Sequence, residues 1–157
     1  MGSSADAKLV FGIELPGDDF VAWAQEYVGE QQTDGGFPEW RYIWGKACGI
    51  EPVTLPYEGN EEAYSEWWDK LRKAEKESGV ELSSFGYGGC DAEEHTWILR
   101  LKDRKFWSYD YTAVPVPISE LEYGMKEITT LTDALKKVGL NPEGYPAPQW
   151  LLCVSYG

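Results

Sequence analysis

Strand-like apolar runs and stretches of helical periodicity alternate along this chain, and glycine or proline bounds most of them. Two of the strand-like runs are consecutive, with only the polar segment Lys102-Asp103-Arg104-Lys105 between them. We interpret that pair as an antiparallel hairpin whose turn is the polar segment. Helices combined with such a hairpin predict a single α+β domain, with a mainly antiparallel sheet of about four to five strands and about three helices.

The strands are predicted from apolar runs that end at turn residues. These runs cover residues 8–15, 80–87, 96–101, 106–114 and 149–156. Pro115 and Pro117 follow the fourth run and should stop its ladder there, because proline has no amide hydrogen to donate.

The helices are predicted from apolar residues that recur three or four positions apart. The first helix should run from Asp18, an N-cap candidate, to about Gln32, and the third should cover Thr130 to Val138 with Thr130 as its cap. The clearest helix covers Glu61 to Ser78 and ends before a glycine. Its apolar stripe consists of Tyr64, Trp67, Trp68 and Leu71.

Residues 33–60 are interrupted by glycine and proline and are predicted to be irregular. Four aromatic side chains lie close together in this segment, namely Phe37, Trp40, Tyr42 and Trp44. Four rings left in water would make an unusually apolar surface patch. They therefore either pack in the core or bind a small ligand, and the sequence leaves both alternatives open.

Hydrophobic residues make up 43% of the 157 positions and aromatic residues 15%, which is far too much apolar mass for a disordered acidic chain. A chain of this length has enough residues for one domain with a real core. We predict that this domain covers residues 7–157. The polar lead 1–6 is expected to be disordered or left over from cloning.

Negative charge is concentrated in the first two thirds of the chain. Residues 1–100 hold 20 acidic and 8 basic side chains, and the net charge of the whole chain is −13. The acids are interleaved with large rings, as in the segment 58–69. Such a surface predicts a basic protein as partner, and it argues against direct binding of nucleic acid or of anionic membranes.

The sequence shows neither a secretory signal nor an apolar run long enough to span a membrane. Its three cysteines, Cys48, Cys90 and Cys153, are widely spaced and form no disulfide framework. We therefore expect a soluble cytoplasmic protein, in a reducing compartment.

The segment 88–95 holds the most varied chemistry, since it contains Cys90, Asp91 and His95, the only histidine. If the protein were a small hydrolase or transferase, Cys90 would be its nucleophile and His95 the base, because a thiolate near pH 7 needs a neighbouring imidazole. The flanking carboxylates would instead raise the thiol pKa, and the spacing matches no catalytic signature. An exposed loop is the favoured interpretation.

Other ligand sites have weaker support. A zinc site would need two ligands besides Cys90 and His95, and no pair of closely spaced cysteines supplies them. The carboxylate pairs Glu61/Glu62 and Glu93/Glu94 and the many tryptophans suggest a sugar-binding groove, but adjacent side chains point in different directions. No cofactor and no metal are predicted.

The favoured hypothesis is a non-enzymatic acidic protein-binding module, of the kind found among inhibitors, immunity proteins and antagonists, that occupies a basic site on a partner. Mimicry of nucleic acid is one form of this hypothesis. The alternatives are the Cys90/His95 enzyme and a small-ligand, sugar-binding protein. The residues predicted to contact the partner are Glu58, Glu61, Glu62, Glu66, Asp69, Trp40 and Trp44.

Overall fold

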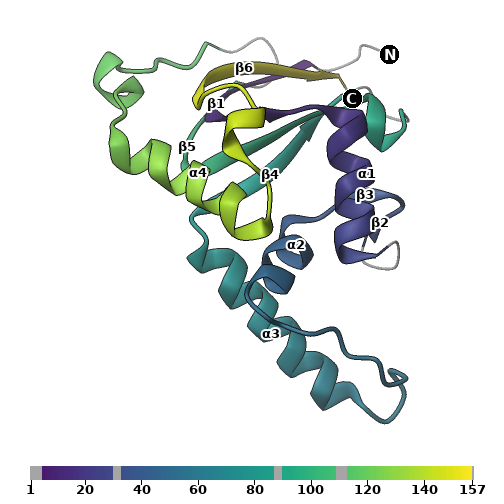
Figure 1. Cartoon of the computed structure of the whole chain (residues 1–157). Helices are drawn as coiled ribbons and strands as arrows, with labels where there is room; N and C mark the ends of the chain where they lie inside the picture. The colour runs from purple at the N-terminus through teal and green to yellow at the C-terminus, as the bar shows by residue number, and fades with distance from the viewer. Residues whose placement is uncertain (1–4, 30–32, 87–89, 109–112, 157) are drawn as a thin grey trace.

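The computed structural model describes residues 5–29, 33–86, 90–108 and 113–156. It confirms the α+β class: an antiparallel sheet of four strands in the order β4-β5-β1-β6, with helices packed on it (Figure 1). The elements are β1 (Ala5–Leu15), α1 (Gly17–Val28), β2 (Thr33–Asp34), β3 (Phe37–Pro38), α2 (Trp40–Ala47), α3 (Glu61–Glu77), β4 (Val80–Phe85), β5 (Thr96–Ser108), α4 (Met125–Val138) and β6 (Gln149–Tyr156). Among the described helices, none is long and apolar enough to cross a membrane.

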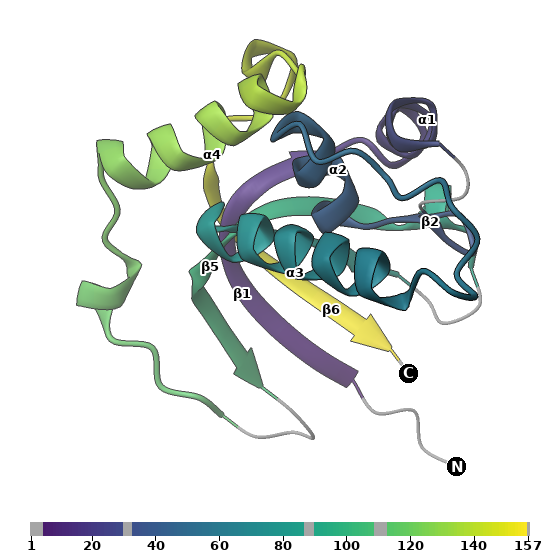
Figure 2. The ribbon, with the colours of Figure 1, turned by 90° about the horizontal axis from the view of Figure 1, so that it is seen from below.

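One face of the sheet carries the main core, which α1, α2 and α4 cover (Figures 1 and 2). Alternate residues of β1 point into this core, from Phe11 to Leu15, and each of the three helices contributes buried apolar residues to it. Val10, just before Phe11, points to the other face, where it forms a second, smaller cluster with Phe85, Ile98 and Cys153. The sheet is therefore apolar on both faces at its centre.

Helix α3 forms an outer layer. Leu71 is its only fully buried residue, and it lies against α2, where Gly45 leaves room for it. A Cβ atom added at Gly45 would lie 2.2 Å from Cδ2 of Leu71. The helix extends from this contact away from the sheet, with its N-terminal half farthest from the strands (Figure 1).

The predicted hairpin is wrong. Both of its runs belong to the single strand β5, and both pair with the same neighbour, β1. Val10 lies opposite Lys105 and Gly12 opposite Arg100, so the polar segment bulges out of the ladder instead of reversing the chain. Of the predicted second run, β5 includes residues 106–108, and residues 109–112 lie outside the described part of the chain.

The bulge holds two helices in place. Lys102 donates from Nζ to the carbonyl oxygen of Glu75, 2.6 Å away in the last turn of α3, where helix carbonyls lack partners. Arg104 donates to the carboxylate of Glu127 in α4 at 3.3 Å and to the carbonyl oxygen of Glu120 at 3.0 Å. The polar side chains that resembled a turn thus bind the ends of α3 and α4.

Helix α4 begins at Met125, earlier than the predicted start at Thr130. The Glu127 carboxylate accepts the backbone N–H of Gly124 at 3.0 Å and so satisfies one of the unpaired donors at the helix start. Thr130 lies inside the helix, where its hydroxyl donates to the carbonyl oxygen of Lys126 at 2.8 Å. The prediction mistook this threonine for the cap.

Residues 33–60 are more regular than predicted, because they contain the short ribbon of β2 and β3 and the helix α2. The remaining boundaries agree with the predictions to within a few residues. Helix α1 ends at Val28, before the predicted end at Gln32, which lies outside the described residues. Strand β1 begins at Ala5, so Ala5 and Asp6 of the expected lead are in the sheet, while residues 1–4 are not described.

The Gly45–Leu71 contact can be tested with a double-mutant cycle. Gly45→Ala should destabilise the protein by about 1–3 kcal/mol, because displacing the buried Leu71 side chain costs more than the roughly 1 kcal/mol that alanine gains in helix propensity. Leu71→Ala alone should cost about 2–5 kcal/mol. In the Leu71→Ala background, Gly45→Ala should become neutral or stabilising in chemical denaturation. Additive effects would contradict this packing.

The Glu127 cap can be tested by its pH dependence. The hydrogen bond from the Gly124 N–H, helped by Arg104, lowers the pKa of the Glu127 carboxyl below its ordinary 4.5. Its contribution to stability is therefore present above pH 4.5 and lost as the pH falls through the lowered pKa. Glu127→Gln should lower the melting temperature at pH 7 and have a smaller effect at pH 2.5. The exposed Glu122→Gln serves as control, and an equal loss at both pH values would contradict the assignment.

Candidate functional site

Most exposed acids of α3 lie in its first half, and its exposed bases lie in the second half together with one exposed acid, Glu77. The predicted acids are all exposed and lie in the N-terminal half of the helix or, for Glu58, in the loop three residues before it: Glu58, Glu61, Glu62, Glu66 and Asp69. The exposed bases Lys70, Arg72, Lys73 and Lys76 follow in its C-terminal half. This order matches the helix dipole, which favours anions near the N-terminus and cations near the C-terminus. The structure therefore concentrates negative charge at the end of α3 that extends away from the sheet.

Large rings surround that acidic end. Tyr57 contacts Tyr64 edge to face with 5.3 Å between ring centroids, and Tyr64 is perpendicular to Trp67 at 6.2 Å. Trp67 lies 6.0 Å from Trp68, and Tyr42 of α2 stacks on Trp67 at 6.1 Å. The rings form one continuous cluster from the loop before α3 to α2.

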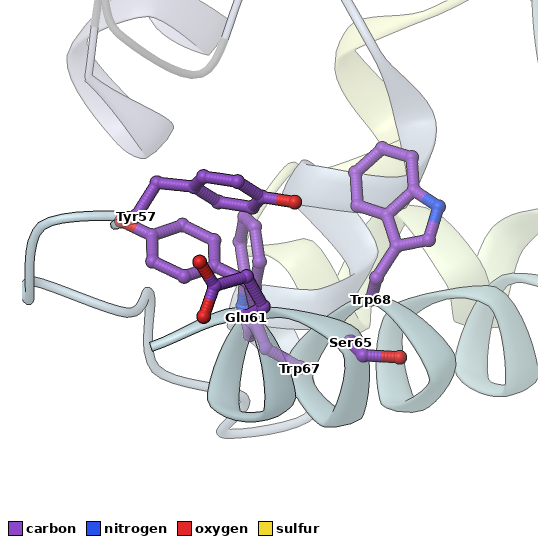
Figure 3. Close-up of a pocket in the computed structure, with 6 residues that line it drawn as sticks. Tyr57, Glu61, Ser65, Trp67 and Trp68 are labelled. Atoms are coloured by element: carbon purple, nitrogen blue, oxygen red, sulfur yellow. The ribbon is translucent and has the colours of Figure 1, made fainter. Parts of the chain in front are cut away.

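An open pocket of about 360 Å³ lies within this cluster. Its walls are the rings of Tyr57, Tyr64, Trp67 and Trp68, together with Glu61 and Ser65 (Figure 3). In Figure 3, Trp68 stands on one side and Glu61 with Tyr57 on the other, and the Tyr57 hydroxyl points toward Trp68. We call this pocket, with its six lining residues, the α3 pocket.

Hydrogen bonds tie the loop that carries Tyr57 to the helix. The Tyr64 hydroxyl donates to the carbonyl oxygen of Leu55 at 2.5 Å, and the Asn60 side-chain amide donates to that of Pro56 at 2.8 Å. The Glu61 carboxylate accepts the N–H of Gly59 at 3.1 Å. Hydrogen bonds from its own N–H and from Gly59 lower the pKa of Glu61, so the pocket keeps its negative charge at neutral pH.

Two of the pocket rings differ in their polar contacts. Two guanidinium groups lie near the Trp68 ring, with Cζ of Arg41 at 5.0 Å and that of Arg72 at 5.7 Å from its centroid. The indole N–H of Trp67 is buried and has no hydrogen-bond partner among the described residues. Nothing in the structure accounts for that unpaired donor.

The other two predicted contact residues, Trp40 and Trp44, lie in the core. Their rings stack on each other at 5.5 Å, and they are only 4% and 9% exposed. The Trp40 indole N–H donates to the hydroxyl of Ser78 at 3.3 Å, so even its polar atom is occupied. The aromatic patch of residues 37–44 thus packs mainly in the core, and these two rings do not belong to the acidic surface.

The predicted Cys90, Asp91 and His95 do not form a catalytic arrangement. The His95 ring lies edge-on to Phe37 at 5.1 Å and directly against Gly86, and neither of its nitrogens has a hydrogen-bond partner among the described residues. Asp91 is exposed and Cys90 half-buried. The thiol–imidazole hydrogen bond that would activate Cys90 is therefore missing from this part of the structure.

Metal and sugar chemistry gain no support from the geometry. Within the described segments, no group of three or more His, Cys, Asp or Glu side chains could hold a metal ion. Of the pair Glu61/Glu62, only Glu61 lines the α3 pocket, whereas glycoside cleavage uses two carboxylates across the bond. Glu93 and Glu94 are exposed in a turn of 3-10 helix (Ala92–Glu94).

Comparison with protein-family models, with curated proteins and with solved structures finds no match to this chain.

The sequence predicted the acids of this site but not the pocket. Trp67 and Trp68 belong to the predicted apolar stripe of the helix, which indicates packing, and no pattern in the sequence distinguishes Tyr57. The available signal was the composition of the α3 stripe, which holds three rings and only one aliphatic side chain, in a helix whose other positions are mostly charged. A narrow apolar stripe on a helix that is charged on its other sides is typical of a helix at the surface of a fold.

The three thiols should differ in reactivity. Burial, and next the charge of Glu14, raise the pKa of Cys153 to about 11, whereas Cys48 is exposed. Because the thiolate is the reactive form, native protein treated with iodoacetamide at pH 7.5 should be labelled at Cys48 and remain unlabelled at Cys153, as measured by peptide mass spectrometry. Cys90 labelled much faster than Cys48 would revive the thiol-enzyme hypothesis.

Proposed function

We propose that this protein is a non-enzymatic binding module that uses the acidic, aromatic end of α3 to occupy a basic site on a partner protein. The observation that carries the proposal is the coincidence, at one protruding helix end, of five exposed carboxylates with an open pocket walled by four aromatic rings. Acids alone would be a solvated helix face, and rings alone would be packing. Together they supply both parts of a protein interface.

The two parts act at different stages of binding. Carboxylates clustered on one protrusion attract a basic surface over a distance set by the Debye length, about 8 Å at physiological ionic strength. They therefore raise the association rate more than the final affinity. Tyrosine and tryptophan rings supply the affinity, because they bury a large apolar area with little loss of side-chain entropy.

The protrusion suits insertion into a concave basic site. Helix α3 has 17 residues, which corresponds to a length of about 25 Å, and the body of the protein holds it at its C-terminal half. The N-terminal half can then enter a groove of the partner without a clash from the sheet. Inhibitors and immunity proteins that block a basic active site need this shape and charge, by analogy of class.

We further place this module in the cytoplasm. The described thiols Cys48, Cys90 and Cys153 form no disulfide, and one of them is exposed, as expected in a reducing compartment.

The test compares two variants with equal changes in net charge. Glu58→Lys/Glu66→Lys/Asp69→Lys reverses three acids at the end of α3, and the control Glu26→Lys/Glu94→Lys/Glu122→Lys reverses three exposed acids elsewhere. Immobilised wild-type protein and both variants are incubated with nuclease-treated lysate of the source cell, eluted with stepwise salt and analysed by quantitative mass spectrometry. A basic protein should bind wild type and control, and be lost from the α3 variant.

For the purified pair, the α3 variant should associate about tenfold more slowly or worse. Retention of the same partners by all three proteins would refute the proposal. Competition by added duplex DNA would identify the partner's site as one that normally holds nucleic acid, which is the mimicry form of the hypothesis.

A further inference from the structure

We infer that the α3 pocket receives an arginine side chain of the partner, with the guanidinium group against the aromatic rings and close to the Glu61 carboxylate. This inference rests on the proposed function and narrows it to one residue type and one subsite. It is carried by the composition of the pocket, which combines four ring walls with a single carboxylate.

The rings are arranged to hold a cation. The faces of aromatic rings carry partial negative charge and attract a cation within about 6 Å of the ring centroid. Tyr57, Tyr64 and Trp67 meet at steep angles, 65° for the first pair and 90° for the second, so the faces of these lining rings point in different directions. Within the described residues, no lysine or arginine of this chain lies over any of these three rings.

Cation–π contacts already exist at the Trp68 wall of the pocket. Arg41 and Arg72 both place their guanidinium groups near the Trp68 ring. Trp68 is thus occupied by cations of this chain, whereas Tyr57, Tyr64, Trp67 and Glu61 have no such counterpart among the described residues. The unmatched half of the pocket is the half that carries the carboxylate.

The number of polar groups favours arginine over other occupants. Besides Glu61, the walls offer the hydroxyl groups of Ser65, Tyr57 and Tyr64, and that of Tyr64 already donates to Leu55. A sugar presents many hydroxyl groups that would lose their hydrogen bonds with water here. The ammonium group of lysine is compact and strongly hydrated, whereas guanidinium is planar, more weakly hydrated and stacks on rings, which form most of this pocket's walls.

The charge on the Glu61 side of the pocket favours a cation, whereas Arg41 and Arg72 already supply positive charge on the Trp68 side. Glu61 lies in the wall, and the exposed carboxylates of Glu58 and Glu62 are its close neighbours in sequence. The hydrogen bonds that Glu61 accepts from its own N–H and from that of Gly59 lower its pKa and so favour the charged form. A guanidinium group entering from a basic partner therefore meets a fixed negative charge and aromatic faces in one site.

The probe for this site is the capped tripeptide acetyl-Gly-Arg-Gly-amide, with two analogues in which lysine or citrulline replaces arginine. Citrulline keeps the planar shape and removes the charge. Binding to the full-length protein is followed by the indole N–H signals in nitrogen-15 NMR spectra. The arginine peptide should shift the signals of Trp67 and Trp68 saturably, and citrulline should bind about tenfold more weakly.

Two variants of the pocket and one matched control locate the site. Tyr57→Leu removes an exposed ring and Glu61→Gln removes the carboxylate charge, and each should weaken the arginine peptide by about threefold or more. Glu122→Gln removes an exposed carboxylate that lies outside both α3 and the lining of the pocket, and it should leave binding unchanged. Circular dichroism of each variant checks that the fold is kept.

Several outcomes would overturn the inference: citrulline or lysine that binds as well as arginine, no saturable shift with any peptide, or shifts caused by methyl glucoside instead. These outcomes leave the proposed function intact if the partner is still lost from the Glu58/Glu66/Asp69 variant. Conversely, the pocket could prove specific for arginine while the same partners still bind the Glu58/Glu66/Asp69 variant. That result would refute the proposed function and confirm the arginine site.

Discussion

The antiparallel pairing of β1 with β5 organises this molecule, because it fixes both faces of the sheet and the positions of two helices. β1 pairs with β5 on one side and β6 on the other, and its alternate residues feed the two apolar clusters. Where the register of β5 shifts, the bulge sends Lys102 and Arg104 out to the ends of α3 and α4. The irregularity in the ladder thus adds hydrogen bonds to the last turn of α3 and to the start of α4.

The attachment of α3 explains why its acidic end is displayed. The helix is held near its C-terminus by Lys102 and in its second half by Leu71 in the space left by Gly45. Its N-terminal half is packed by rings, chiefly against Tyr42 of α2 and the loop that Tyr64 binds. Helix stability accounts for the acids in the first turn, since their negative charge interacts favourably with the positive end of the helix dipole. It does not account for Tyr57 or the open space beside it, and this is why the rings weigh more than the acids in the functional argument.

The sequence predicted what depends on local pattern and failed where pairing or burial decides. Helix α3 was predicted almost to the residue because its periodicity, its acidic start and its terminal glycine all agree. The prediction of a hairpin was wrong because a polar segment between two β-rich runs is compatible with either a turn or a bulge. Only the pairing with the partner strand distinguishes the two. Helix α2 was not predicted, because an eight-residue helix rich in aromatic residues has little intrinsic helix propensity. It forms by burying Trp40, Ile43 and Trp44.

The same distinction applies to the candidate site: its exposed acids follow from local pattern, and its pocket depends on packing. Exposure of the acids on α3 follows from their positions on a charged helix face, so the sequence could predict it. The pocket could not be predicted, because Tyr57 reaches it from a loop whose path depends on hydrogen bonds to Asn60 and Tyr64. Trp40 and Trp44 show the opposite error, since the same residue type at similar spacing fills the core when its helix lies on the sheet. Whether a tryptophan packs or binds is therefore decided by the layer in which its helix lies.

Because α3 lies in the outer layer, the stability of its N-terminal half depends on whether the α3 pocket is occupied. A helix with a single fully buried residue gains little from the core, and elements with few buried apolar contacts open at low free-energy cost. The half-buried rings of its N-terminal part supply much of the remaining stabilisation, and an occupant of the pocket would bury them further. Anything that binds only the ordered helix stabilises it by mass action. The same rings thus order the end of α3 and, in the function that we propose, recognise a partner that would bury them further.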